Sequence, residues 1–297
     1  MPLTHTRAFR VRFDECDAYG HVNNAVYLRY MQETAFDASA AAGFGAARYT
    51  AMGRLWLTHD TQIDYLRPLA YGDTVAVTTW VADFARVRSR RMYELRQAGS
   101  GELVAQAHTD WVFLDAASRR PAPIPADLIR AFFLDEPAPQ LKREPFPAAP
   151  PPPPGPFSVR RRVEWRDVDT AGIVNNPNYL AYVAEAGFAV SEAHGWPHQR
   201  MEAAGFGILA RRHRLEHRRP AGYGDELLIT TWASAMRAAS GVRHYQITRA
   251  ADGELVTRVH SQYVWVDRRT LKPIRIPADF LADFAPNIAG AGPTVPS

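Results

Sequence analysis

The stretch Asp17-Ala-Tyr-Gly-His-Val-Asn-Asn-Ala-Val-Tyr27 returns later in the chain as Asp169-Thr-Ala-Gly-Ile-Val-Asn-Asn-Pro-Asn-Tyr179. Further segments repeat at the same displacement of 152 positions: Tyr71-Gly72-Asp73 with Tyr223-Gly224-Asp225, Thr78-Thr79-Trp80 with Thr230-Thr231-Trp232, and Ile124-Pro125-Ala126-Asp127 with Ile276-Pro277-Ala278-Asp279. Matches at one constant displacement along most of a chain indicate an internal duplication. The sequence therefore predicts two copies of one structural unit.

The duplication and the composition between the copies predict the domain organisation. Residues 1–136 are expected to form a first domain and residues 158–288 a second. The intervening segment, 137–157, contains the run Pro150–Pro154. Proline at this density favours extended polyproline II, so the segment is interpreted as a semi-rigid linker. Residues 289–297, which begin with Ala289-Gly290-Ala291-Gly292-Pro293, are predicted to form a disordered tail.

Each copy shows the same order of predicted elements. A short strand (Phe9–Phe13; Val159–Trp165) precedes the Asp/Gly/Asn loop, and a helix follows over Ala25–Ala42 or Pro177–His194. Asn176 is expected to cap the second helix and Pro177 to occupy its first position, where a missing N–H is tolerated. Because the helix is apolar or small nearly all round, it is predicted to be enclosed by other structure.

Segments rich in β-branched and aromatic residues follow the predicted helix. In the first copy they cover Thr61–Leu66, Thr74–Val81, Met92–Leu95 and Leu103–Leu114, and a short helix begins at Pro125. One strand, one long helix and four antiparallel strands predict an α+β class in which a sheet wraps around one helix.

Composition and charge narrow the class of protein. A content of 46% hydrophobic and 22% charged residues is typical of a soluble globular protein, and no apolar stretch approaches the roughly 18 residues of a membrane span. Met1–Phe13 lacks the apolar region of a signal peptide, and a single cysteine, Cys16, suits a reducing compartment. These features predict a cytoplasmic protein with no membrane partner.

The net charge of +4 includes several clusters of arginines, such as Arg160–Arg162. Guanidinium groups match phosphate oxygens, although solvated strand faces and loop ends are the more common explanation of any one such cluster. No nucleic-acid-binding motif accompanies the charge, so a nucleic-acid partner is not expected. The sequence shows no Cys/His cluster and predicts neither a metal nor a cofactor.

The duplicated stretch resembles the signature of the hotdog-fold thioesterases, Asp-x-x-Gly-x-Val followed by asparagines and a helical tyrosine. The resemblance is to the branch that includes 4-hydroxybenzoyl-CoA thioesterase and the tandem acyl-ACP thioesterases, and it covers both copies. It implies two tandem hotdog domains that pair as an internal pseudo-dimer, with association of two chains left open. It also implies hydrolysis of acyl thioesters, with acyl-CoA or acyl-ACP as the substrate.

The resemblance implies roles for individual residues. Asp17 and Asp169 match the catalytic carboxylate of the family, and the backbone N–H groups of Asn24 and Asn176 match the donors that polarise the thioester carbonyl. His21 matches a histidine that takes part in the acyl-ACP relatives. The second copy departs from that pattern, because it carries Ile173 at this position.

Chemistry supports the same residues independently. A thioester carbonyl under attack gains negative charge, which the N–H groups and the positive dipole end at a helix N-terminus can stabilise. Because Pro177 has no N–H, the second copy must use Asn176 or a neighbour such as Asn178. The carboxylate either attacks the carbonyl carbon or removes a proton from water. A competing interpretation gives Asp17 and Asp169 only a loop-capping role in an Asx turn.

Other residues rank behind these. Asn23 and Asn175 either shape the loop or contact substrate, Asp64 and Glu216 loosely match an acid of some relatives, and His108 and His260 are interpreted as structural. Two alternative functions stay open: a hotdog hydratase or dehydratase, and a non-catalytic acyl-CoA-binding module.

Overall fold

The computed structural model describes residues 2–133 and 139–290 and divides into two compact units, Met1–Pro145 and Phe146–Ser297. Of the predicted tail, Ala289 and Gly290 are described, and the Ala289 N–H donates to the Ala233 carbonyl at 2.8 Å; residues 291–297 lie outside the described part. The domain bounds inferred from the duplication stay a prediction.

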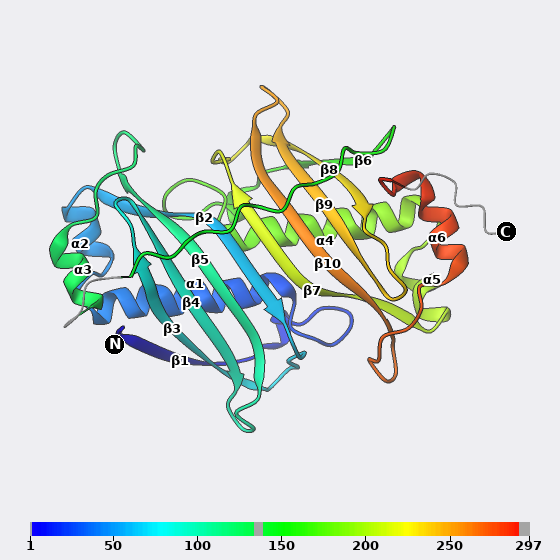
Figure 1. Ribbon diagram of the computed structural model, residues 1–297, viewed down its shortest axis with the longest axis horizontal. Coiled ribbons are helices and arrows are strands. Elements are labelled where there is room, and N and C mark those ends of the chain that lie inside the picture. The colour runs from blue at the N-terminus through cyan, green and yellow to red at the C-terminus, as the bar shows by residue number, and fades with distance from the viewer. Residues whose placement is uncertain (1, 134–138, 291–297) are drawn as a thin grey trace. The chain divides into compact units, whose positions relative to one another are not determined.

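Unit 1 is built from one sheet and one long helix (Figure 1). Its elements are β1 (Thr4–Arg10), η1 (Phe13–Glu15), α1 (Asn24–Ala41), α2 (Ala46–Ala51), β2 (Arg54–Tyr65), β3 (Thr74–Phe84), β4 (Arg88–Gln97), β5 (Leu103–Asp115) and α3 (Ala126–Phe132). The strand order is β1-β3-β4-β5-β2, and neighbouring strands are antiparallel.

Unit 2 repeats this arrangement. Its elements are β6 (Phe157–Arg162), η2 (Trp165–Asp167), α4 (Asn176–Ala193), α5 (His198–Ala203), β7 (Phe206–His217), β8 (Glu226–Ser234), β9 (Ser240–Arg249), β10 (Leu255–Asp267), α6 (Ala278–Phe284) and η3 (Ala285–Asn287). The strand order β6-β8-β9-β10-β7 is that of unit 1, again antiparallel throughout. The predicted α+β class is confirmed.

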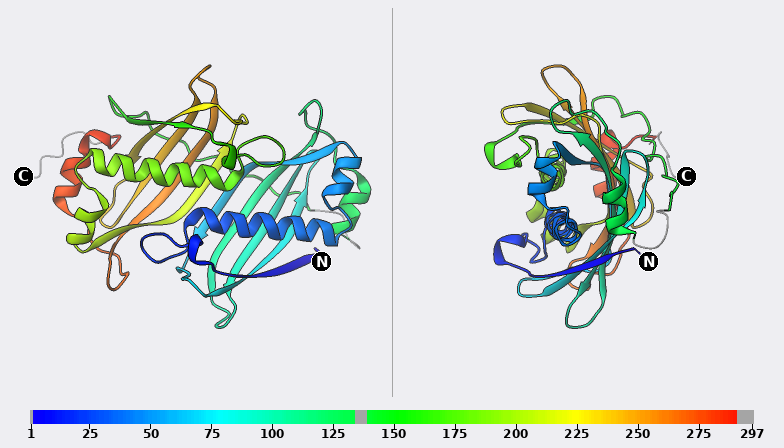
Figure 2. Two further views of the ribbon diagram at one scale, coloured as in Figure 1. Left: turned by 180° about the vertical axis from the view of Figure 1, so that it is seen from behind. Right: turned by 90° about the vertical axis from the view of Figure 1, so that its left-hand side faces the viewer.

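Each long helix lies against one face of its own sheet, which curves around it (Figure 2). The buried side of α1 carries large apolar residues, among them Tyr27, Leu28 and Met31. The opposite side is not enclosed, contrary to the prediction: Phe36 is 52% exposed, and its counterpart Phe188 in α4 is 49% exposed. A single sheet can cover only one side of a helix, and small alanines fill part of the uncovered side without forming a second core.

Several boundaries differ from the sequence prediction. β1 and β6 end at Arg10 and Arg162, three residues early, because the following residues turn into the short helices η1 and η2. β2 begins at Arg54 rather than Thr61. The short helices α2 and α5 lie in segments for which no element was predicted.

The segment predicted as a linker packs against the sheets. In unit 1 it crosses the face of the sheet opposite α1, where the Leu141 N–H donates to Asp83 Oδ2 at 3.0 Å (Figure 1). In unit 2, Trp232 Nε1 donates to the Pro150 carbonyl at 3.2 Å. The guanidinium carbon of Arg258 lies 4.3 Å from the centre of the Phe146 ring. These contacts anchor the segment to both units.

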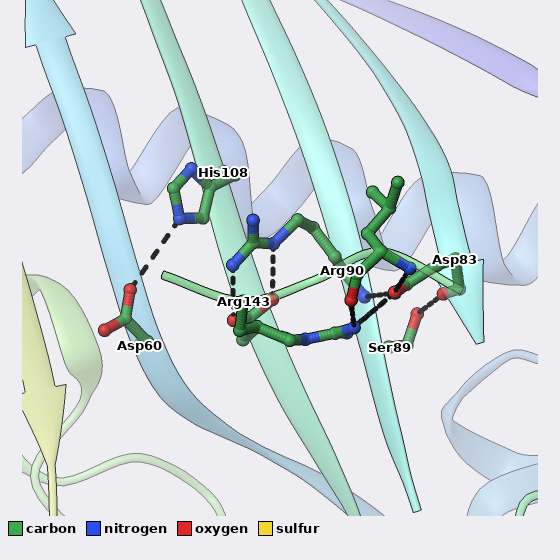
Figure 3. Close-up of polar contacts among 8 residues, drawn as sticks. Asp60, Asp83, Ser89, Arg90, His108 and Arg143 are labelled. Carbon is green, nitrogen blue, oxygen red and sulfur yellow. Dashed lines mark hydrogen bonds and ion pairs between the residues drawn. The ribbon is translucent and has the colours of Figure 1, made fainter. Parts of the chain in front are cut away.

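Arg143 of this segment enters a cluster of charged side chains on the same face of unit 1 (Figure 3). Its guanidinium forms an ion pair with Asp83, whose side chain is 0% exposed, and lies 3.7 Å from Asp110. Arg90 binds Asp110 with two hydrogen bonds of 2.8 Å. His108 lies 3.7 Å from Asp60 in the same layer. The cluster balances buried carboxylates with guanidinium groups, as burial of charge requires.

A buried histidine in unit 2 predicts acid sensitivity. His213 is 2% exposed, its Nδ1 lies 2.7 Å from Ser261 Oγ, and burial lowers its pKa to about 3. In the unfolded chain the histidine has a pKa near 6.5. Between about pH 6.5 and 3 it is therefore protonated in the unfolded chain and neutral in the folded one. Stability is therefore complete above pH 6.5 and falls as the pH is lowered through this window, by about 1.4 kcal/mol per pH unit for one group.

We expect His213→Gln to remove the share of the slope that this residue contributes, because glutamine can bond Ser261 without titrating, while His244, whose pKa burial lowers to about 4, keeps its own share. The free energy of unfolding, measured in urea at pH 7.0, 5.5 and 4.5, would show it. His5→Gln, a change on the edge strand β1, serves as the control and should leave the slope unchanged. Equal slopes for His213→Gln and the parent protein would contradict the prediction.

Candidate functional site

A tight loop holds Asp17 immediately before α1. The Asp17 N–H donates to the His21 carbonyl at 2.8 Å, and the Gly20 N–H donates to the Asp17 carbonyl at 2.9 Å. Gly20 has a φ of 78°, which a side chain disfavours. Cys16 and Val22 close the base of the loop by a backbone bridge. The spacing Asp-x-x-Gly thus determines the course of the backbone.

The second copy forms the same loop with different intervening residues. The Asp169 N–H donates to the Ile173 carbonyl and the Gly172 N–H donates to the Asp169 carbonyl, both at 2.9 Å. Gly172 has a φ of 74°. His21 and Ile173 therefore contribute the same backbone carbonyl, and the difference between the copies at this position lies in the side chain alone.

Both aspartates form an Asx turn. Asp17 Oδ1 accepts from the Tyr19 N–H at 2.9 Å, and Asp169 Oδ1 accepts from the Ala171 N–H at 2.8 Å. This is the geometry that the loop-capping interpretation requires. A carboxylate has two oxygens, so a turn made through Oδ1 is compatible with chemistry at Oδ2. Asp17 is exposed and Asp169 is half-buried.

The two helices begin one residue earlier than predicted, at Asn24 and Asn176. Asn23 is the N-cap of α1, and its Oδ1 accepts from the Ala25 N–H at 2.9 Å. Asn175 is the N-cap of α4, but its side chain makes no cap hydrogen bond. The reason is chemical: Pro177 stands where Ala25 supplies the N–H. The prediction that Asn176 caps the second helix is wrong.

The difference between the two N-caps can be tested with a matched pair of substitutions. We expect Asn23→Ala to lower the free energy of unfolding by about 1 kcal/mol, because the Ala25 N–H loses its acceptor. Asn175→Ala should change it by less than about 0.5 kcal/mol, since no cap bond is lost. Thermal or urea unfolding of the two variants tests this, and an equal loss in both would contradict it.

Asn24 and Asn176 are the first residues of their helices. The carbonyl that would accept from their N–H groups within a helix lies one turn earlier, and the helix has no such turn. The Asn178 N–H donates to the Asn175 carbonyl at 2.9 Å, and Pro177 has none. The Asn178 N–H is therefore bonded within the first turn of the helix. The positive end of the helix dipole lies at the same place.

The remaining predicted residues lie elsewhere or have other partners. Within the described residues, no hydrogen bond or ion pair joins the His21 ring to Asp17. Glu216, which is buried, pairs with Arg258 at 2.6 Å and with Arg218 at 2.7 Å. His108 belongs to the face of the sheet opposite α1 (Figure 3).

Sequence reasoning missed His217, whose Nε2 lies 2.8 Å from Asn176 Oδ1. Its counterpart in the repeat is Tyr65, whose hydroxyl donates to the Asn24 carbonyl at 3.0 Å, a contact that the sequence does not reveal. The described residues contain no group of three or more His, Cys, Asp or Glu side chains placed to hold a metal. No helix among residues 2–133 and 139–290 has the length and apolar character of a membrane span.

Comparisons with known proteins agree with the duplicated fold. The model of the thioesterase-like superfamily matches residues 11–132 and again 163–284. The palmitoyl-acyl carrier protein thioesterase of Cuphea hookeriana is 24% identical over 281 residues, which cover 88% of this chain and 62% of the relative. That of Arabidopsis thaliana is 24% identical over 287 residues, covering 88% and 64%. The chain thus spans about three fifths of the length of these curated relatives.

Solved structures share the fold. A 12:0-ACP thioesterase from Umbellularia californica superposes with a TM-score of 0.69 at 21% identity, covering 88% of this chain and 93% of the other. An acyl-ACP thioesterase from Bacteroides thetaiotaomicron gives a TM-score of 0.68 at 19% identity, covering 88% and 97%. Each unit is a hotdog fold, and because the family model covers most of both units, the chain belongs to the thioesterase-like superfamily.

Proposed function

We propose that this protein hydrolyses acyl thioesters to a free acid and a thiol. One observation carries the proposal: in both copies an aspartate is held by the same backbone loop immediately before the first turn of a long helix. The loop supplies an acid, and the helix start supplies N–H donors and a positive dipole end. Membership of the thioesterase-like superfamily supports the same reaction.

In the proposed reaction the N–H groups of Asn24 and Asn176 polarise the thioester carbonyl, while Asp17 and Asp169 deliver the nucleophile. If the carboxylate attacks directly, a C–O bond to the acyl group forms, the C–S bond breaks, and water then hydrolyses the anhydride. If it acts as a general base, it takes a proton from the water that attacks the carbonyl. In both routes the thiolate leaves and is protonated.

The proposed substrates are acyl-CoA and acyl-ACP. The relatives of the two plant species are named as thioesterases of acyl carrier protein, which supports a carrier-bound acyl group. Exposed arginines on both units suit the phosphates of either carrier. Hydrolysis on either carrier releases the same terminal thiol, so one assay can compare them.

The test is thiol release from a panel of acyl-CoA and acyl-ACP substrates, followed with a chromogenic thiol reagent. Cys16 is the only cysteine and would react with the reagent. The Cys16→Val variant, which takes the residue of the second copy at Val168, removes this background without changing the loop. Catalytic release of thiol from at least one substrate supports the proposal, and no release from any of them would refute it.

The same panel separates the alternatives. The Asx turns of Asp17 and Asp169 are the observation that favours a non-catalytic acyl-CoA-binding module, which would bind acyl-CoA in calorimetry without turnover. A hydratase would add water to an enoyl-CoA and release no thiol.

We further propose that the two copies pair as an internal pseudo-dimer in the cytoplasm, with neither nucleic acid nor membrane as a partner. Light scattering measures the oligomeric state. A mass near 33.2 kDa indicates a single chain, and twice this value indicates that two chains associate.

A further inference from the structure

Each copy carries a pair of aromatic rings on its surface. In unit 1 the rings of Phe13 and Tyr71 meet edge to face with their centres 5.8 Å apart, and in unit 2 those of Trp165 and Tyr223 do so at 5.5 Å. All four residues are exposed, Phe13 by 80% and Trp165 by 75%. A single exposed apolar residue is common, but an exposed ring pair that recurs in both copies indicates a contact surface.

Short hydrogen-bonded turns hold the rings of unit 1 in place. Phe13 is the first residue of η1, where the N–H of the preceding residue donates to Glu15 Oε2 at 2.7 Å. Tyr71 lies in the turn between β2 and β3, which the Ala70 N–H closes by donating to Asp73 Oδ2 at 2.8 Å. Unit 2 repeats both bonds, each at 2.9 Å. A ligand that packs on these rings therefore requires little further ordering of the backbone.

The turn that carries the tyrosine pairs with the Asp-x-x-Gly loop. In unit 1 a backbone bridge joins His21 to Ala70, the residue before Tyr71, and unit 2 has the same bridge. Phe13 precedes Asp17 by four residues, so their Cα atoms are at most about 14 Å apart. The ring pair of each copy therefore lies beside the proposed thioester site of that copy.

An arginine accompanies the rings at the same position of each copy. Arg10 ends β1 and Arg162 ends β6, and both are exposed. The guanidinium carbon of Arg10 lies 5.4 Å from the centre of the Tyr71 ring. Within the described part of the chain neither arginine has a carboxylate partner, whereas the nearby Arg12 pairs with Asp14 at 3.0 Å. A guanidinium without a carboxylate of its own suits a phosphate.

We propose that each ring pair binds the phosphopantetheine arm of the thioester substrate. The rings contact the two methyl groups and the amides of the arm, and Arg10 or Arg162 contacts its phosphate. This inference rests on the proposed function and identifies the part of the substrate that the surface recognises. CoA and acyl carrier protein share this arm, and its extended chain from sulfur to phosphate can span the distance between the aspartate and the rings.

Two other parts of the substrate fit the surface less well. In an extended acyl-CoA the adenine lies beyond the phosphate, further from the sulfur than the rings lie from Asp17. A specific protein interface buries about 1,200 Å² or more, and two rings with one arginine supply only a small part of such an area. The phosphopantetheine arm matches the surface in size, in apolar character and in charge.

The test uses thioesters of one acyl group on carriers of increasing length. N-acetylcysteamine lacks both the methyl groups and the phosphate, pantetheine adds the methyl groups, and 4′-phosphopantetheine adds the phosphate. CoA and acyl carrier protein complete the series. Thiol release gives kcat/KM for the parent, for the ring variant Phe13→Ala/Trp165→Ala, and for the arginine variant Arg10→Gln/Arg162→Gln.

The two variants should differ in the substrates that they affect. The ring variant should lower kcat/KM by about five- to thirtyfold for pantetheine and every longer carrier, since one methylene in an enclosed pocket is worth about ten- to two-hundredfold and an open surface encloses it less. It should leave the N-acetylcysteamine thioester unaffected. The arginine variant should lower kcat/KM by about three- to tenfold, only for carriers with the phosphate, and less at high salt because exposed charges are screened.

Matched controls keep the composition of the surface or change it elsewhere. The exchange Phe13→Trp/Trp165→Phe keeps an aromatic ring in each copy and should keep kcat/KM for all carriers. Arg130→Gln/Arg275→Gln removes one exposed arginine in α3 and one just before α6, at the other end of each long helix (Figure 1), and should also change nothing. Melting temperatures identify any loss that is due to unfolding.

Saturation-transfer NMR with S-methyl pantetheine, which cannot be hydrolysed, reports the contact without turnover. The two methyl groups of the arm should receive strong saturation from the parent protein and lose it in the ring variant. Absence of this signal in the parent would overturn the inference.

Kinetic outcomes that would also overturn it are an equal loss with the N-acetylcysteamine and pantetheine thioesters, or no loss with any carrier. A loss with acyl-CoA alone would assign the rings to the adenine, and a loss with acyl-ACP alone would assign them to the carrier protein. The proposed function fails in a different way: a parent protein that releases no thiol from any of these thioesters, but shows the NMR contact, would refute hydrolysis and not the contact.

Discussion

Thiol release is expected to fall by about a hundred- to ten-thousandfold when Asp17 and Asp169 are both replaced by asparagine, the range typical for loss of a positioned acid or base. Asparagine keeps the shape of aspartate and can make the same Asx turn through its side-chain oxygen. The substitution therefore removes the negative charge while the hydrogen bonds to Tyr19 and Ala171 are retained. Only chemistry that needs a carboxylate should be affected.

The matched control is the double alanine variant, which removes both the charge and the Asx turns. We expect it to lose as much activity as the asparagine variant and, in addition, about 1 kcal/mol of stability for each turn, as for other caps of this kind. If the aspartates only capped their loops, the asparagine variant would keep its kcat and the alanine variant would not. That outcome would exclude the proposed role of both residues.

The single variants compare the copies. Asp17→Asn leaves the second loop intact, and Asp169→Asn leaves the first intact. With both copies active, each single variant should retain a substantial share of the parent rate. A single variant as inactive as the double variant would assign turnover to one copy.

The second large effect concerns stability. Replacing Arg143 by glutamine is expected to lower the free energy of unfolding by about 3–5 kcal/mol, the cost of leaving a buried charge without its partner. The Asp83 side chain is 0% exposed. Without Arg143 its remaining partners in this cluster are neutral backbone donors, the N–H groups of Arg90 and Leu141. Urea unfolding at pH 7 measures the loss.

Two further variants separate this ion pair from a general effect of losing an arginine. Asp83→Asn in the Arg143→Gln background should restore much of the stability, because both charges of the pair are then gone. Arg67→Gln removes an arginine paired with Glu102 at the surface, and we expect a loss below about 1 kcal/mol. If Arg143→Gln also lost less than about 1 kcal/mol, the segment of residues 137–157 that carries Arg143 would be only loosely bound to the sheet of unit 1.

The organisation into two hotdog units could be predicted from the chain because its signals are local and repeated. Helix, strand and turn preferences act over a few residues, and each appears twice at the same displacement, so chance patterns are excluded. The loops of Asp17 and Asp169 belong to the same class: an aspartate followed three residues later by a glycine with positive φ determines the turn by itself. Their role in chemistry stays a prediction.

The helix start was predicted one residue too late for a reason that is also local. Both residues of an Asn-Asn pair can cap a helix, and propensity does not distinguish between them. The structure selects Asn23 and Asn175, and Pro177 then leaves Asn175 without a bond that Asn23 has. Choosing between neighbouring caps required the path of the backbone.

The sequence by itself determined the duplication, the α+β class and the shape of each Asp-x-x-Gly loop, because these depend on neighbours along the chain. Only the tertiary structure decided that Arg143 lies over Asp83 and that His217 bonds Asn176, residues separated by 60 and 41 positions. Such contacts depend on which strands become neighbours and which face each side chain takes. Strand pairing is a property of the whole sheet, and no short segment specifies it.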